Sequence, residues 1–129
     1  QFAPDPATFD AIEVVGYNWA GIWNIDWKVP DEIFNYSLAE LARALPGKPI
    51  ILRAACTEKN GLPATSTFVL EKSKPNWILQ LGQLAHAHKE VEEVTWIDQL
   101  LSDGKSDWTL DSSPEAAEAW REITKKQRR

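Results

Sequence analysis

The stretch Lys48-Pro-Ile-Ile-Leu-Arg-Ala-Ala-Cys56 decides the fold of this chain. Its apolar residues follow one another instead of alternating with polar ones, which is typical of a parallel strand that is covered on both faces. The pair Pro46-Gly47 stands just before it and is expected to end a preceding helix. The stretch therefore predicts a buried strand of a parallel sheet.

Segments with helix and strand patterns alternate on both sides of this strand. Further strands are predicted over residues 11–19 and 91–98. Helices are predicted to begin near Asp31, at Pro75 and after Pro114. The predicted fold class is α/β, with the order β-α-β-α-β-α, parallel strands and right-handed crossovers. The apolar residues of the first helix recur at helical spacing: Ile33, Phe34, Leu38, Leu41 and Leu45.

The chain length allows one domain. Its 129 residues divide into a Pro-rich surface segment, 1–10, and three successive β/α units, 11–46, 47–90 and 91–129. A full (β/α)₈ barrel takes about 250 residues. We therefore expect a single partial-barrel domain or a small open sheet, whose open sides are completed or covered by oligomerisation.

The composition excludes several classes of function. The net charge of −5 disfavours a nucleic acid or an anionic membrane as partner. No run of about 18 apolar residues is present, so no segment is expected to span a membrane. The sequence has no Met, and its start at Gln1 is compatible with removal of a signal peptide, so we expect a secreted protein.

No cofactor or metal site is expected from the motifs. Neither the dinucleotide-binding pattern G-x-G-x-x-G nor a Walker A loop occurs, and the G-x-S-x-G pattern of a nucleophile elbow is also missing. Cys56 is the one cysteine and is expected to be a buried apolar residue. His86 and His88 lie two residues apart on a predicted helix, so their side chains point to different faces and cannot chelate one ion.

Candidate ligand-binding residues lie where the predicted strands end. Tyr17, Asn18 and Trp19 close the first strand, and Trp96 and Asp98 close the third. Ligands of parallel α/β folds lie at these carboxyl ends. Aromatic faces with amides and carboxylates between them suit sugar rings, whose C–H faces stack on aromatic rings. We therefore expect an oligosaccharide as ligand; the alternative is that the aromatic residues belong to the core or to an interface.

Two further tryptophans, Trp23 and Trp27, follow in the predicted loop of residues 20–30. With Trp19 they recur every four residues, but this spacing defines no stacking platform in a loop. Aromatic anchors are enriched where protein chains meet. We expect Trp23 and Trp27 to lie in a contact between chains, and Trp19 to lie in a sugar cleft.

Five segments follow one another in the order of a known barrel, and they cover residues 11–123. Together they resemble the last three β/α units of a glycoside hydrolase of the family 26 type, which comprises β-mannanases and lichenases. The resemblance implies a barrel fold in which Trp96 forms the floor of a sugar subsite. Three segments resemble the sixth, seventh and eighth barrel strands and two resemble helix entries: Ile12-Glu-Val-Val-Gly-Tyr-Asn-Trp19, Gly47-Lys-Pro-Ile-Ile-Leu52, Val91-Glu-Glu-Val-Thr-Trp-Ile-Asp98, Pro75-Asn-Trp-Ile78 and Asp107-Trp-Thr-Leu-Asp-Ser-Ser-Pro114.

The chain departs from this family at the catalytic positions. Retaining glycosidases need two carboxylates about 5–5.5 Å apart, a nucleophile and a general acid/base. The resemblance places Ala54 at the position of the nucleophile, and the acid/base would lie on a fourth barrel strand that has no counterpart here. Glu58 lies four residues further on, beyond the predicted strand end, and is the candidate for a displaced nucleophile.

Three functions remain open from the sequence. The first is a glycoside hydrolase-like partial barrel without a catalytic carboxylate pair, which acts in binding or structure and is related to carbohydrate. The second is a subunit or fragment of an active β-mannanase or β-glucanase, completed by another chain that supplies the missing strands. The third is an unrelated small α/β binding domain. Open strand edges favour a homo-oligomer, most simply a dimer.

Overall fold

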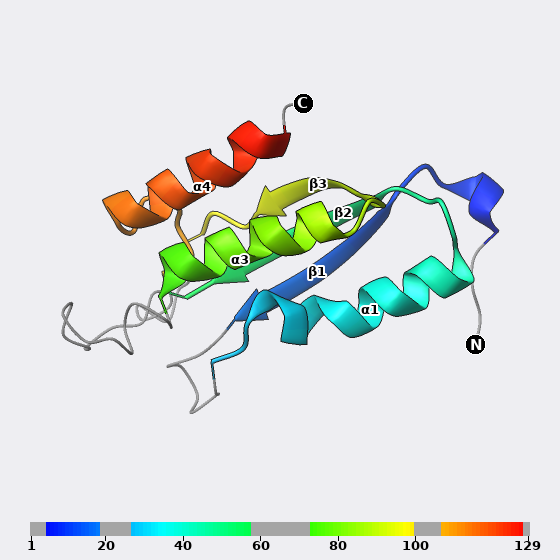
Figure 1. Ribbon diagram of the computed structural model, residues 1–129, viewed down its shortest axis with the longest axis horizontal. Coiled ribbons are helices and arrows are strands. Elements are labelled where there is room, and N and C mark those ends of the chain that lie inside the picture. Colours follow the sequence, from blue (N-terminus) through cyan, green and yellow to red (C-terminus); the bar gives the residue numbers. More distant parts are fainter. Residues whose placement is uncertain (1–4, 19–26, 58–72, 100–106, 128–129) are drawn as a thin grey trace.

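The computed structural model describes residues 5–18, 27–57, 73–99 and 107–127. Three of the residues singled out from the sequence, Trp19, Trp23 and Glu58, lie outside these ranges. The described residues form three strands and three α-helices in the order β-α-β-α-β-α, which confirms the predicted α/β class (Figure 1). A short 3₁₀ helix, Pro6–Thr8, precedes the first strand.

The strands form one parallel sheet in the order β1-β2-β3. The pairing of β1 with β2 keeps one register from Ile12 opposite Ile50 to Asn18 opposite Cys56. The pairing of β2 with β3 shifts once, between Ile50 and Ile51. The strands extend over Ile12–Asn18 (β1), Ile50–Cys56 (β2) and Val91–Trp96 (β3).

The helices begin where local chemistry predicts. Helix α1 has Pro30 at its first position and Asp31 and Glu32 in its first turn, where the helix dipole favours acids. Helix α3 is capped by the Ser73 hydroxyl, which accepts a hydrogen bond from the Asn76 N–H at 3.3 Å. The helices extend over Pro30–Ala44 (α1), Lys74–Ala87 (α3) and Pro114–Gln127 (α4).

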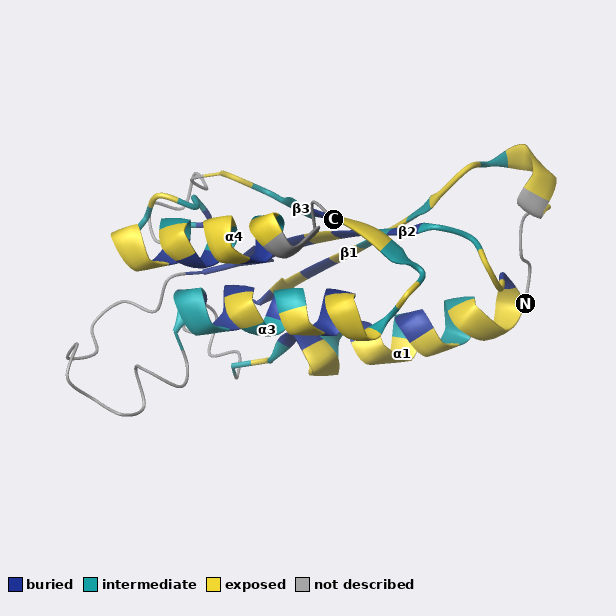
Figure 2. Cartoon of the chain, turned by 45° about the horizontal axis from the view of Figure 1, so that its top comes forward, coloured by how far each residue is buried: buried dark blue, intermediate teal, exposed yellow. Residues whose placement is uncertain are grey.

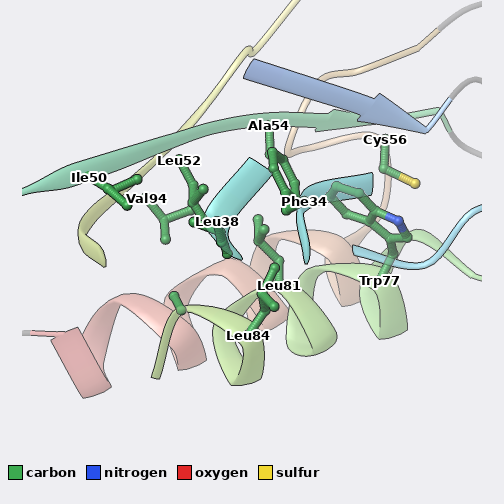
Figure 3. Close-up of a cluster of buried hydrophobic side chains, with 11 residues drawn as sticks. Phe34, Leu38, Ile50, Leu52, Ala54, Cys56, Trp77, Leu81, Leu84 and Val94 are labelled. Atoms are coloured by element: carbon green, nitrogen blue, oxygen red, sulfur yellow. The ribbon is translucent and has the colours of Figure 1, made fainter. Parts of the chain in front are cut away.

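The helices that the structure describes cover one face of the sheet, whereas the apolar run of β2 predicted cover on both faces. On the other face Ala55 is buried and Arg53 is exposed. Leu52, Ala54 and Cys56 point from β2 toward the helices and are fully buried (Figure 3). The strands follow one another in sheet order, and right-handed crossovers then place both connecting helices on the same side. The other side, the helix-free face, carries the alternate residues of each strand. It comprises Glu13, Val15, Tyr17, Ile51, Arg53, Ala55, Glu93 and Thr95.

The core lies between the sheet and the inner sides of the helices, whose outer sides are exposed (Figure 2). One cluster joins the sheet to α1 and α3, and a second joins α3 to α4. Trp96 and Trp120 pack against both clusters. The β1–α1 contact is close at Gly16, where an added Cβ would lie 2.6 Å from Ile33 Cγ2 and would clash.

Candidate functional site

The carboxyl ends of the three strands meet at one edge of the sheet, the carboxyl edge, and Trp108 connects them. The Trp108 ring stacks on Tyr17, with centroids 5.1 Å apart and planes 14° apart. Its Nε1 donates a hydrogen bond to the Thr57 hydroxyl at 2.8 Å, and its backbone N–H donates to the Gln99 carbonyl at 3.0 Å. Trp108 therefore contacts Tyr17 near the end of β1, Thr57 just after β2 and Gln99 just after β3. The Trp108 side chain itself is buried, at 5% exposed.

Tyr17 is a candidate ligand residue that stays accessible at this edge. It belongs to the helix-free face and is 36% exposed. Its neighbour across the strand pair, Ala55, is fully buried. Because Trp108 packs against the Tyr17 ring, this phenol is held in place at the carboxyl edge.

Asn18 lies on the opposite side of β1 and is only 1% exposed. Its Nδ2 donates to the Cys56 sulfur at 3.4 Å, and its Oδ1 accepts from the Lys28 N–H at 3.2 Å. Its carbonyl also accepts from the Thr57 N–H at 3.1 Å. These contacts join the end of β1 to β2 and to the segment before α1, so the Asn18 amide has a structural role. Its role as a ligand residue stays a prediction.

Trp96 faces the helices and not the helix-free side. Its ring meets Trp77 and Trp120 edge-on, with both centroid distances 5.9 Å. Its Nε1 donates to the Trp108 carbonyl at 2.6 Å, and the Lys74 ammonium lies 6.0 Å from the ring centroid. Trp96 therefore packs between α3 and α4 in the described part of the chain, and its predicted place at the floor of a sugar subsite stays a prediction.

Asp98 and Asp107, two described carboxylates near the carboxyl edge, accept hydrogen bonds from the backbone of the segment that leads to α4. Asp98 is exposed, and its Oδ1 accepts from the Leu110 N–H at 2.8 Å. Asp107 accepts from the Thr109 N–H at 2.9 Å. The Asp107 contact fixes a turn, and the Asp98 contact joins the end of β3 to this segment.

Ala54 is fully buried among apolar side chains of the helix-facing core, including Phe34 (Figure 3). The neighbouring positions, Arg53 and Ala55, are the ones on the helix-free face. A carboxylate at position 54 with this backbone would point into the core. Arg53 instead forms an ion pair with Glu13 at 3.5 Å, and both side chains are about half exposed.

Trp27, predicted to lie between chains, is half-buried and packs against the larger core cluster of its own chain. Its Nε1 is buried and has no hydrogen-bond partner among the described residues. The adjacent Lys28 carbonyl accepts from Trp77 Nε1 at 2.8 Å, which holds this segment against α3. A contact of Trp27 with another chain stays a prediction.

Two residues that position the carboxyl edge were missed from the sequence. For the segment around Trp108 the sequence predicts only the entry to a helix. The available signal is an aromatic residue between the polar residues Asp107 and Thr109. Lys74 is fully buried, and its ammonium donates to the carbonyls of Asp107 and Thr109 and to the Ser112 hydroxyl. A lysine before a helix proline carries no local signal of burial.

Two hollows border the helices away from this edge. One, of about 500 Å³, lies between α1 and α3 and includes Asn35 and Gln80. The buried Gln80 Oε1 has no hydrogen-bond partner in the part of the chain that the structure describes. The other, of about 480 Å³, lies beside β1 and α1. Neither includes Tyr17 or Asp98.

The described ranges hold no group of three or more His, Cys, Asp and Glu side chains arranged to bind a metal ion. Within the same ranges no helix is long and apolar enough to cross a membrane. Secretion stays a prediction.

The fold and this edge place the chain in the class of α/β units that have three parallel strands and aromatic residues at the carboxyl edge. No family model matches the chain. The chain is similar to Endoglucanase H of Acetivibrio thermocellus, with 27% identity over 116 residues. The match covers 88% of this chain but 11% of the relative, so the chain spans about a tenth of that protein's length. The chain thus resembles a region of a glycoside hydrolase.

Proposed function

We propose that this chain is a partial barrel of the glycoside hydrolase family 26 type that contacts carbohydrate without hydrolysing it alone. Support for the relationship comes from the order of the five family-like segments and from the similarity to an endoglucanase. The observation that carries the functional part is the carboxyl edge. It presents the accessible Tyr17 ring, while Ala54, the residue to which the resemblance assigns the nucleophile position, is buried in the core.

The proposed contact with sugar uses the Tyr17 ring as a stacking surface. The Tyr17–Trp108 stack orients the ring before any ligand arrives, which lowers the entropy lost on binding. Arg53 and Glu13 lie on the same face and offer donors and acceptors to hydroxyl groups. Trp108 is buried, so its part is to position Tyr17 and not to touch the ligand.

Titration with manno- and gluco-oligosaccharides, followed by calorimetry, tests this proposal. We expect binding that Tyr17→Ala weakens by about tenfold, because an aromatic stacking partner contributes on the order of 1 kcal/mol or more. Tyr36→Ala is the matched control, since Tyr36 is 76% exposed on α1 and lies away from the carboxyl edge. Absence of binding, or equal loss in both variants, would contradict the proposal.

A second candidate function is a piece of an active glycosidase that another chain completes. The observation in its favour is that the relative is an endoglucanase of which this chain spans a small share. Double displacement needs two carboxylates about 5–5.5 Å apart. The resemblance to the family 26 type would place the acid/base on a fourth barrel strand, which has no counterpart in these 129 residues.

An assay of the purified chain on mannan and β-glucan separates the two candidates. For the binding function we expect no turnover, because loss of even one catalytic group costs orders of magnitude in rate. Glu58→Gln is the informative variant. Turnover that disappears in Glu58→Gln would identify Glu58 as a nucleophile and would favour the hydrolase.

A further inference from the structure

The outer edge of β1 presents backbone hydrogen-bonding groups that the sheet does not use. The Ile12 N–H donates to the Pro49 carbonyl at 2.9 Å, and the Asn18 carbonyl accepts from the Thr57 N–H at 3.1 Å, so even-numbered residues of β1 bond toward β2. Successive residues of a strand direct their N–H and C=O groups to opposite sides. The backbone groups of Glu13 and Val15 therefore point away from β2, toward the outer edge.

Side chains at the outer edge of β1 are exposed, and a groove borders this edge. Val15 is 45% exposed on the helix-free face. A groove of about 480 Å³ runs between β1 and α1 and is lined in part by Val15, Leu41 and Tyr36, of which Tyr36 is 76% exposed. An accessible edge with exposed apolar residues is a template for pairing with another strand.

We propose that a second copy of this chain pairs with this edge, β1 against β1 in antiparallel direction, around a two-fold axis at Val15. In this register Val15 faces Val15 of the second copy, and the two residues exchange both N–H···O=C bonds, as their outward backbone groups require. Glu13 then faces Tyr17 of the second copy, which places a carboxylate beside a phenol. The arrangement is isologous, since the same surface serves both copies.

Charge repulsion favours a two-fold axis at Val15 over one at Glu13. A two-fold axis at Glu13 would set two carboxylates directly opposite each other, which destabilises a strand pair. The opposite edge of the sheet is less suited, because β3 carries two exposed acids, Glu92 and Glu93, within its six residues. Charges of one sign on an edge strand oppose pairing between identical edges.

The two-fold axis also brings the helices together. In an edge-to-edge pair it stands perpendicular to the sheet, so the helix-covered faces of both copies lie on the same side. Helix α1 packs along β1, and its exposed Tyr36 borders the groove there. The α1 helices of the two copies therefore lie side by side, and the groove and Tyr36 become part of the interface.

Sedimentation velocity across a concentration series tests the pairing. We expect a dimer of the 129-residue chain that Val15→Lys weakens by about tenfold or more, because two ammonium groups then face each other across the two-fold axis. Val15→Thr, which keeps the branched shape, should leave the dimer intact. A chain that stays monomeric at about 100 μM, a concentration well above a micromolar dissociation constant, or a dimer that ignores Val15→Lys, would overturn the proposal.

A cross-link reports the register even if Val15→Lys disturbs folding. Facing residues of an antiparallel hydrogen-bonded pair have Cα atoms about 5.5 Å apart, within the range of a disulfide. Val15→Cys in a Cys56→Ala background should form a covalent dimer on mild oxidation, whereas Glu92→Cys on β3 should not. The reverse pattern would place the contact on the β3 edge. The cross-link reports the pairing directly, and calorimetry measures sugar binding in a separate experiment.

Discussion

At the scale of single residues, Lys74 is a cation inside the protein that organises the chain around it. It is fully buried, and its ammonium donates at 3.1 Å to the Asp107 carbonyl and at 2.9 Å to the Ser112 hydroxyl. It also donates to the Thr109 carbonyl. Buried charge is stable when hydrogen bonds replace its hydration, so Lys74 fixes the segment that carries Trp108.

We expect Lys74→Met to lower the free energy of unfolding by about 2–3 kcal/mol, because the thioether fills the space but leaves buried acceptors without a donor. Urea unfolding measures the change. Lys48→Met is the matched control, since Lys48 is half-buried and its ammonium donates a hydrogen bond to the Phe9 carbonyl at 2.8 Å. Its cost should stay below about 1 kcal/mol. Equal costs in the two variants would show that Lys74 has no special role.

At the scale of elements, the contact between α3 and α4 depends on Gly82. A Cβ at this position would lie 2.4 Å from Ile123 Cγ2 and 2.9 Å from its Cβ. The two helices therefore approach more closely than a side chain at position 82 would allow. This approach brings Ile123 against Ile78 in the second core cluster.

We expect Gly82→Ala to destabilise the protein by about 1–3 kcal/mol through overpacking. In a helix without this contact, the same change would stabilise by about 0.5–1 kcal/mol, so the sign of the effect is diagnostic. Gln83→Ala, at an exposed position one residue further on, controls for helix propensity. Thermal and urea unfolding measure both variants. A stabilised Gly82→Ala would contradict the close packing of α3 and α4.

At the scale of the whole molecule, two core clusters are joined by shared tryptophans. Trp96 and Trp120 are partly buried and pack against both clusters, and their rings meet at 5.9 Å. Loss of either cluster would expose the same indoles. We therefore expect the described ranges to unfold as one cooperative unit, and the single domain stays a prediction.

We expect helix content, followed by far-UV circular dichroism, and tryptophan fluorescence to change together in urea, with one midpoint and one slope. Trp120→Leu should lower the midpoint, because it removes contacts from both clusters, while the two curves stay coincident. Early loss of helix signal with unchanged fluorescence would mean that α4 unfolds as a separate unit.

Local patterns were sufficient for the element order. The apolar run around Leu52 and the helical spacing of Phe34 and Leu38 depend only on near neighbours, and both correctly marked buried positions. Proline and glycine set the element ends for the same reason: their effects on the backbone act within a few residues, as at Gly47, where φ is 81°.

The assignment of residues to a site depended on the tertiary structure. Asn18 and Tyr17 are adjacent in sequence, yet one is enclosed by Cys56 and Lys28 and the other lies on the helix-free face. Strand alternation predicts that they differ, but only the placement of the helices decides which face is buried. Patterns along the sequence were enough to predict an α/β chain with aromatic residues at the ends of its strands. Contacts between distant segments decided that Trp96 packs between helices, that Trp108 holds Tyr17, and that Lys74 is buried, because burial is set by packing across the chain and not by neighbours along it.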